Sequence, residues 1–146
     1  MALIKSDNLP PNIRDSVLAQ MGKDNIAKVA KARKRTDKAD LEHAVQDACL
    51  SALKALGYCV WRQNVGVVKI EGRYVKFGTT GAADITGMML DGRRLEVETK
   101  RRKGGVQSPD QKAFQAMIEA SGGVYILASS IDDLLAGLEK ADACNE

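Results

Sequence analysis

Apolar residues recur at helical spacing in the segment from residue 41 to residue 56. Along it they fall at i, i+3, i+4, i+7 and onward: Leu41, Ala44, Val45, Ala48, Cys49, Ala52, Leu53 and Leu56. Such a stripe is typical of a helix that packs one face on a core. Asp40 is a candidate N-cap and Gly57 a candidate C′ residue, so we expect a helix over residues 41–56. Cys49 lies on the stripe, which favours a buried thiol.

The chain from residue 58 to residue 100 alternates short β-rich runs with turn residues. The pattern predicts strands over residues 58–62, 65–70, 74–77, 82–90 and 93–100. Glu71-Gly72-Arg73 is typical of a turn, and Asp91-Gly92 indicates a two-residue hairpin turn.

Two capped helices follow. Ser108, Pro109 and Gln111 form a capping box with proline at N1, and Gly122-Gly123 ends that helix. We expect it to bury Phe114, Met117 and Ile118. After a short apolar strand at 124–128, Ser130 and Asp133 predict a second capping box and a helix to about Ala141, which buries Leu134, Leu135 and Leu138. The order of elements predicts an α/β fold with a mixed central sheet flanked by helices.

Length and composition indicate one globular domain. The 146 residues include 45% apolar and 28% charged residues, which are ordinary values for a soluble protein. No apolar run is long enough to cross a membrane, and the first residues lack the core of a signal peptide. Three widely spaced cysteines fit neither a disulfide framework nor a zinc site. We therefore expect a cytoplasmic protein without a membrane partner.

Positive charge is concentrated at the beginning of the chain. Residues 1–40 carry nine Lys/Arg and five Asp/Glu, whereas residues 41–146 carry thirteen and fourteen. Within the first part, Ile13, Val17, Leu18 and Met21 are spaced for one helical face. We interpret residues 1–39 as a basic extension, partly helical or mobile and outside the core, in front of a domain over residues 40–146. It either binds nucleic acid or only solubilises the chain; its candidate phosphate contacts are Lys31, Arg33, Lys34 and Arg35.

Acidic residues gather on one predicted strand. Strand alternation puts Glu96, Glu98 and Lys100 on one face and Leu95 and Val97 on the other, with Asp84 on the preceding strand. Carboxylate oxygens suit Mg²⁺ or Mn²⁺. A lysine beside them can hold or help deprotonate an attacking water. The alternative is a solvated polar face without chemistry.

The order of these motifs resembles the VRR-NUC domain of the PD-(D/E)XK nuclease superfamily, near its Holliday-junction-resolvase branch. The resemblance covers about residues 40–138. It is carried by Gly81-Ala-Ala-Asp84-Ile-Thr-Gly87, Glu98-Thr99-Lys100, Gly104-Gly105, Ser108-Pro109-Asp110-Gln111, Phe114, the run from Leu56 to Asn64, and Gly122-Gly123-Val124-Tyr125. The glycines beside Asp84 stand where a ligand or another backbone can approach closely. The resemblance implies a restriction-endonuclease-like core.

The resemblance also implies a metal-dependent phosphodiesterase. Asp84, Glu98 and the backbone carbonyl of Thr99 would bind Mg²⁺, for which Mn²⁺ would substitute, and Lys100 would position water. Glu42 would hold a second metal or a metal-bound water, or would only favour the helix dipole. Gln111 would lie near the scissile phosphate, cap its helix, or do both. The remaining candidates for nucleic-acid contact are Arg62, Asn64, Arg101, Arg102 and Lys103; for the last three the alternative is a solvated loop.

Two residues depart from the family pattern. Ala83 stands where the superfamily has its proline, and Glu96 is an additional acid that could be a further ligand or a partner of Arg94 or Lys100. Stand-alone VRR-NUC proteins, often from phages, resemble junction-cleaving dimers. The resemblance thus implies a structure-selective DNA endonuclease acting as a homodimer, in the host cytoplasm if a phage encodes it. The rival hypothesis is a non-catalytic nucleic-acid-binding or interaction protein on a nuclease fold.

Overall fold

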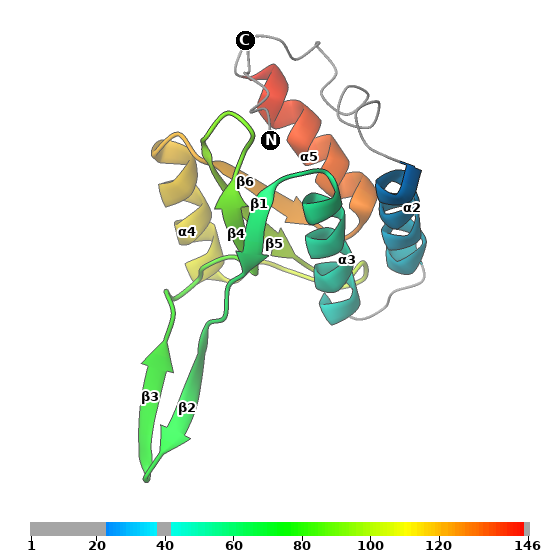
Figure 1. The fold of residues 1–146 in the computed structure, drawn as a ribbon. Coiled ribbons are helices and arrows are strands. Elements are labelled where there is room, and N and C mark those ends of the chain that lie inside the picture. The colour runs from blue at the N-terminus through cyan, green and yellow to red at the C-terminus, as the bar shows by residue number, and fades with distance from the viewer. Residues whose placement is uncertain (1–22, 38–41, 145–146) are drawn as a thin grey trace.

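The structure is a computed structural model that describes residues 23–37 and 42–144 (Figure 1). The expectations for Asp40 and for the helical face of Ile13, Val17, Leu18 and Met21 lie outside these residues. The elements in chain order are α2 (Lys23–Asp37), α3 (Glu42–Ala55), β1 (Cys59–Arg62), β2 (Gly66–Ile70), β3 (Arg73–Phe77), β4 (Ile85–Met88), β5 (Arg94–Thr99), α4 (Pro109–Ala120), β6 (Val124–Ala128) and α5 (Ile131–Ala143).

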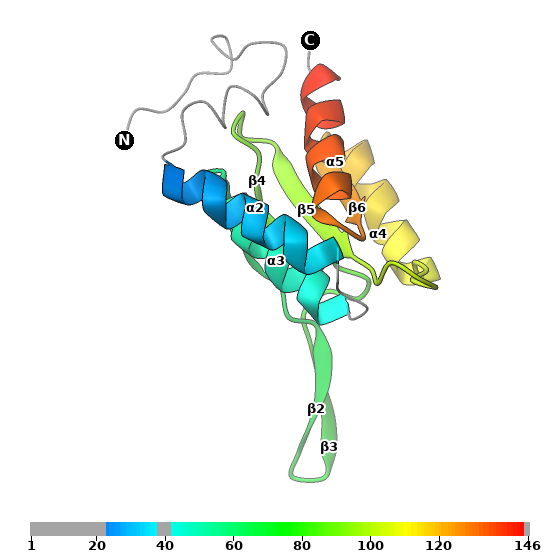
Figure 2. The same cartoon turned by 90° about the vertical axis from the view of Figure 1, so that its right-hand side faces the viewer.

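A four-stranded mixed sheet forms the centre of the molecule, in the order β1-β4-β5-β6. The β1/β4 and β4/β5 pairs are antiparallel, while β5 and β6 are parallel. Helices α3 and α5 lie on one side of the sheet and α4 on the other, and α2 lies along the outside of α3 (Figures 1 and 2). The predicted mixed α/β class, with a mixed sheet between helices, is confirmed.

The strand β5 is buried on both faces. Leu95 and Val97 belong to the main core with residues of α3 and α5. On the other face, Phe114 and Ile118 of α4 form a smaller cluster with Ala83. The prediction that Met117 is buried is wrong, because its side chain is 52% exposed. Phe114 and Ile118, four residues apart, already fill the narrow contact of α4 with the sheet.

Local sequence signals explain how the helices end and begin. Gly57, at φ 87°, ends α3: its N–H donates to the carbonyl of Lys54, and that of Tyr58 donates to the carbonyl of Leu53. These two bonds form a Schellman motif, in which Gly57 is the C′ residue, as the sequence predicts. Ser108 and Gln111 form the predicted capping box of α4.

The cap of α5 differs from the predicted capping box by one residue. Ser130 accepts from the N–H of Asp133, but the Asp133 carboxylate accepts from Ser129 rather than from Ser130.

The β4–β5 connection is not a two-residue turn. The N–H of Met89 donates to the carbonyl of Arg93, which leaves three residues in the loop, with Gly92 at φ 91°. A positive-φ glycine in the third position is typical of such loops.

The expectation that residues 23–35 stay outside the core is wrong at two positions. In α2, Val29 and Ala32 are 7% and 2% exposed and belong to the main core cluster. They lie three residues apart, hence on one face, and the small Ala32 allows α2 to approach α3 closely. Arg33 also pairs with Asp132 of α5 at 2.9 Å. Among the described helices, none is both long and apolar enough to cross a bilayer.

The strands β2 and β3 form a separate two-stranded ribbon that extends away from the body (Figures 1 and 2). All of its strand residues except Gly66 are exposed. The two-residue turn is Glu71-Gly72, with φ values of 49° and 82°. Both strands were predicted, but their separation from the central sheet was not.

Gly87 fixes the distance between β4 and its edge neighbour β1. A Cβ atom there would lie 2.1 Å from the carbonyl oxygen of Cys59 and 2.7 Å from a methyl group of Val60. Since the obstructing atoms include backbone, an alanine could be accommodated only by displacing β1. Asp84 lies just before β4, so this glycine also helps to set the position of that carboxylate.

We predict that Gly87→Ala lowers the free energy of unfolding by about 3 kcal/mol, the upper range for overpacking of an interior. Gly122→Ala is the matched control. Gly122 has φ 80°, but a Cβ atom on it would have no other atom within 4 Å, so that change costs only backbone strain of about 1 kcal/mol. Urea denaturation of both variants measures the difference; equal losses would contradict the account of Gly87.

Candidate metal centre

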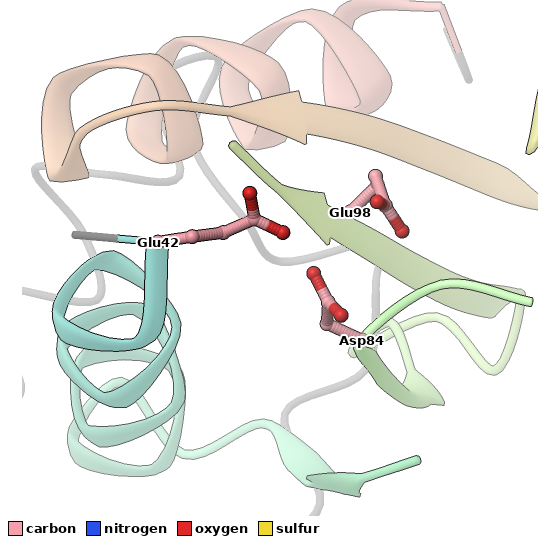
Figure 3. Close-up of side chains that lie close together, drawn as sticks. All are labelled: Glu42, Asp84 and Glu98. Atoms are coloured by element: carbon pink, nitrogen blue, oxygen red, sulfur yellow. The ribbon is translucent and has the colours of Figure 1, made fainter. Parts of the chain in front are cut away.

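Three carboxylates converge at one end of the sheet: those of Glu42, Asp84 and Glu98 (Figure 3). One oxygen from each lies within 4.8 Å of the others. Glu42 is the first residue of α3, Asp84 immediately precedes β4, and Glu98 lies near the end of β5. The structure thus brings together the three acidic side chains that the sequence analysis assigned to metal binding.

Asp84 is held by Thr99 of the neighbouring strand. Its Oδ2 accepts from the Thr99 N–H at 2.9 Å and from Thr99 Oγ1 at 2.7 Å. The family resemblance implied only a contact between the Thr99 carbonyl and metal, so the bonds from the Thr99 hydroxyl and N–H to Asp84 were not predicted. The sequence contains little indication of these bonds, because strand alternation puts Thr99 on the core face with Leu95 and Val97.

Close backbone packing positions the loop that carries Asp84. Gly81 has φ 77°, and a Cβ atom on it would lie 2.3 Å from the carbonyl oxygen of Asp110 in the first turn of α4. The N–H of Gln63 donates to the carbonyl of Asp84 at 2.8 Å. The sequence left open whether a ligand or a backbone approaches the glycines at 81 and 87. In the structure, backbone approaches both.

Glu98 is almost fully buried, and only one of its two carboxylate oxygens has hydrogen-bond donors among the described residues. Its Oε1 accepts from Lys100 Nζ at 2.6 Å and from Gln111 Nε2 at 2.5 Å. Its Oε2 is buried and has no hydrogen-bond partner among the described residues. Leaving a buried charged oxygen without a partner is costly, and a bound cation would remove that cost.

The surroundings of Glu98 oppose its ionisation. Burial raises the pKa of Glu98 to about 7; the Lys100 ammonium lowers it, and the charges of Asp84 and Glu42 raise it. Because the pKa in the fold exceeds the ordinary value of 4.5, this group makes the fold less stable as the pH rises from about 4.5 to 7. A cation bound between the carboxylates would favour the ionised form of Glu98 and would oppose this loss of stability.

Gln111 acts in two places at once. Its Oε1 accepts from the Ser108 N–H at 2.9 Å and completes the capping box, while its Nε2 donates to Glu98. The sequence left open whether Gln111 caps its helix, belongs to the site, or does both. In the structure its side chain bonds both to the cap residue Ser108 and to Glu98 of the acidic cluster.

Glu96 lies on the same strand face but outside the cluster. Its Oε1 accepts from Thr86 Oγ1 and from Arg94 Nε, both at 2.6 Å. Of the two basic partners that the sequence allowed for Glu96, it pairs with Arg94, because Lys100 pairs with Glu98.

The candidate phosphate contacts are distributed over three regions. Arg101, Arg102 and Lys103 are exposed in the loop that directly follows Lys100. At the end of β1, Arg62 pairs with Asp47 and Asn64 is exposed. Of the candidates on α2, Lys31, Arg33 and Lys34 are exposed, and the Arg35 side chain lies outside the described part. Only the residues after Lys100 are adjacent in the chain to the acidic cluster.

The donor set of the cluster fits a hard divalent cation. All three side chains offer oxygen, which Mg²⁺ and Mn²⁺ prefer. Oxygens bound to an octahedral Mg²⁺ ion lie about 3 Å apart at neighbouring positions and about 4.2 Å apart at opposite ones. Carboxylate oxygens that lie within 4.8 Å of one another would therefore have to close by up to roughly 2 Å around the ion. Exposed Glu42 can supply part of this closure by a rotamer change.

Comparisons with known proteins do not add to these observations. No protein-family model matches the chain, and neither a curated protein nor a solved structure matches it.

We predict that Thr99→Val destabilises the protein and weakens metal binding. The valine keeps the shape and the N–H but removes the hydroxyl bond to the Asp84 carboxylate, which is worth about 1.5–3 kcal/mol for a charged acceptor. Urea denaturation and a calorimetric titration with Mn²⁺ measure the two effects. Thr80→Val, in the exposed loop before Gly81, is the control; equal behaviour of the variants would contradict the assigned role of Thr99.

Proposed function

We propose that the protein is a Mg²⁺-dependent DNA endonuclease with a restriction-endonuclease-like core of the VRR-NUC type. The observation that carries the proposal is the environment of Glu98, which clusters with Asp84 and Glu42. One of its oxygens is held by the buried Lys100, and the other has no hydrogen-bond partner in the described part of the chain. The mixed sheet between helices is compatible with this fold.

Phosphodiester hydrolysis needs charge neutralisation and an activated water. A bound Mg²⁺ ion, replaceable by Mn²⁺, would supply Lewis acidity and lower the pKa of a coordinated water. Asp84 and Glu98 would hold it, with Glu42 from the opposite side. The Thr99 carbonyl remains a proposed further ligand.

Lys100 gives the cluster a feature that simple cation binding does not require. Its side chain is buried, and its ammonium lies 2.6 Å from Glu98. A buried lysine beside a metal-binding carboxylate can orient the attacking water or stabilise charge on the phosphate. Gln111, fixed on the same carboxylate, sets the position of that oxygen. This arrangement favours catalysis over the rival hypothesis of a non-catalytic binding or interaction protein.

The basic residues that follow Lys100 suit a polyanionic substrate. Arg101, Arg102 and Lys103 are exposed and would contact phosphates next to the cleaved bond. We propose a branched or otherwise structured duplex as substrate, with four-way junctions cut by a homodimer, because symmetric incision requires two active sites. The proposed compartment is the cytoplasm, or the host cytoplasm for a phage protein.

We predict that Asp84→Asn abolishes Mg²⁺-dependent cleavage while DNA binding persists or improves, since the change removes both a ligand and a repulsive charge. The test incubates labelled linear, nicked, flap, splayed-arm and four-way DNAs with Mg²⁺ or with EDTA. Asp110→Asn, a loss of the same charge at the start of α4, is the control and keeps activity. Wild-type protein that cleaves none of these DNAs would overturn the proposal.

Lys100→Met separates catalysis from metal binding. The substitution keeps the volume of the side chain but removes the ammonium, so we expect cleavage to fall by about 100-fold or more, as for loss of a general acid–base group. Mn²⁺ binding, measured by calorimetry, should persist because the lysine is not a ligand. Lys112→Met on the exposed side of α4 is the control. A folded Lys100→Met variant that cleaves at the control rate would remove Lys100 from the mechanism.

A further inference from the structure

The β2–β3 ribbon is the largest feature that the proposed chemistry does not use. Opposite residues of an antiparallel pair point to the same face. The pairs Val67–Lys76 and Lys69–Tyr74 therefore make one face, and the pairs Gly66–Phe77, Val68–Val75 and Ile70–Arg73 make the other. One face is basic and aromatic, and the other is mainly apolar.

The basic face presents lysine side chains beside an exposed aromatic ring. Lys69 Nζ lies 5.6 Å from the centre of the Tyr74 ring, whose side chain is 75% exposed. Lys76 adjoins this pair on the same face, whereas Arg73, next to the turn, lies on the other face. Over residues 65–77 the chain carries three basic residues, Lys69, Arg73 and Lys76, and one acidic residue, Glu71. This charge complements a polyphosphate, and an exposed tyrosine adds a contact surface for sugars or bases.

The ribbon leaves the body beside the acidic cluster. The Gln63 N–H donates to the Asp84 carbonyl, so the residue that leads into the ribbon is bonded to a member of the cluster. At the return, Gly78 packs against the carbonyl of Asn64; a Cβ there would lie 2.7 Å from that oxygen. The ribbon projects from the end of the body at which α3 begins and the loop between β5 and α4 lies (Figure 2).

The dimensions of the ribbon match a groove of duplex DNA. Five residues per strand extend about 17 Å, and two strands lie about 5 Å apart. The major groove, about 12 Å wide, admits a two-stranded ribbon. The apolar face contributes to the rigidity of the arm through the Val68–Val75 pair and through the Phe77 ring, which lies over Gly66.

We propose that the β2–β3 ribbon is a DNA-binding arm: it lies in a groove of the duplex, sets Lys69 and Lys76 against phosphates, and holds the duplex beside the acidic cluster. This inference rests on the proposed function in that it takes DNA as the substrate. It adds a second region of contact, and it accounts for an exposed ribbon attached directly next to Asp84.

The test measures duplex binding without cleavage. Fluorescence anisotropy of a labelled duplex is recorded in EDTA between about 50 and 200 mM salt for wild type and for the double variant Lys69→Ala/Lys76→Ala. We expect the affinity at about 100 mM salt to fall roughly tenfold, and the log–log salt slope to flatten by about two, close to one for each lost phosphate contact. Lys69→Gln/Lys76→Gln, which retains long polar side chains, should give the same result.

The matched control is Lys54→Ala/Lys140→Ala. Both lysines are exposed in the last turns of α3 and α5, at the end of the body away from the ribbon (Figure 1), and their loss changes the net charge equally. An affinity and slope equal to those of the control would overturn the inference. So would loss of a dimer, seen by light scattering, with an unchanged salt slope, since a second copy would then occupy the ribbon.

Failure of this inference is distinguishable from failure of the proposed function. If the ribbon variants lose duplex binding but wild-type protein cleaves no DNA with Mg²⁺, the arm stands and the endonuclease does not. If cleavage depends on Asp84 but the ribbon variants bind as the control does, the endonuclease stands and the arm does not.

Discussion

The buried carboxylate of Glu98 is the constraint on which the rest of the structure depends. An ionised group in the interior is tolerated only where charge and hydrogen bonds compensate it. Here one oxygen is compensated by Lys100 on the same strand and by Gln111 at the beginning of α4. The end of β5 and the first turn of α4 must therefore meet at this point. Burial of both faces of β5 holds the strand there, and the contact between Gly81 and Asp110 brings the Asp84 loop to the same place.

Much of this arrangement could be predicted from local signals. The stripe along α3, the glycine that ends it and the capping box of α4 each depend on residues within one or two turns, so the sequence contains the complete interaction. The acidic face of β5 is likewise a consequence of strand alternation. The convergence of Asp84 with Glu98 followed from predicting adjacent strands, and that of Glu42 from the family resemblance alone.

The remainder depends on tertiary contacts that no local pattern encodes. A ribbon and a strand of a central sheet have the same two-residue period, so nothing local distinguished β2 and β3 from β1 and β4. Val29 and Ala32 form too small an apolar face to predict burial, and only the proximity of α3 covers them. Thr99 alternates as a core residue, and its bonds to Asp84 depend on the register of the β4–β5 pair, which differs by one residue from that of the predicted two-residue turn.

The double use of Gln111 links a helix end to the state of the acidic cluster. Its amide oxygen closes the cap on Ser108, and its amide nitrogen is bonded to Glu98. Any ligand that draws Glu98 to a new position also alters the orientation of that amide and hence the stability of the cap. Thermodynamic linkage makes the effect reciprocal. The exchange of backbone amides with solvent in the first turn of α4 reports local opening of that turn. The exchange rate therefore depends on whether a ligand is bound at the acidic cluster, even when the ligand does not contact the helix.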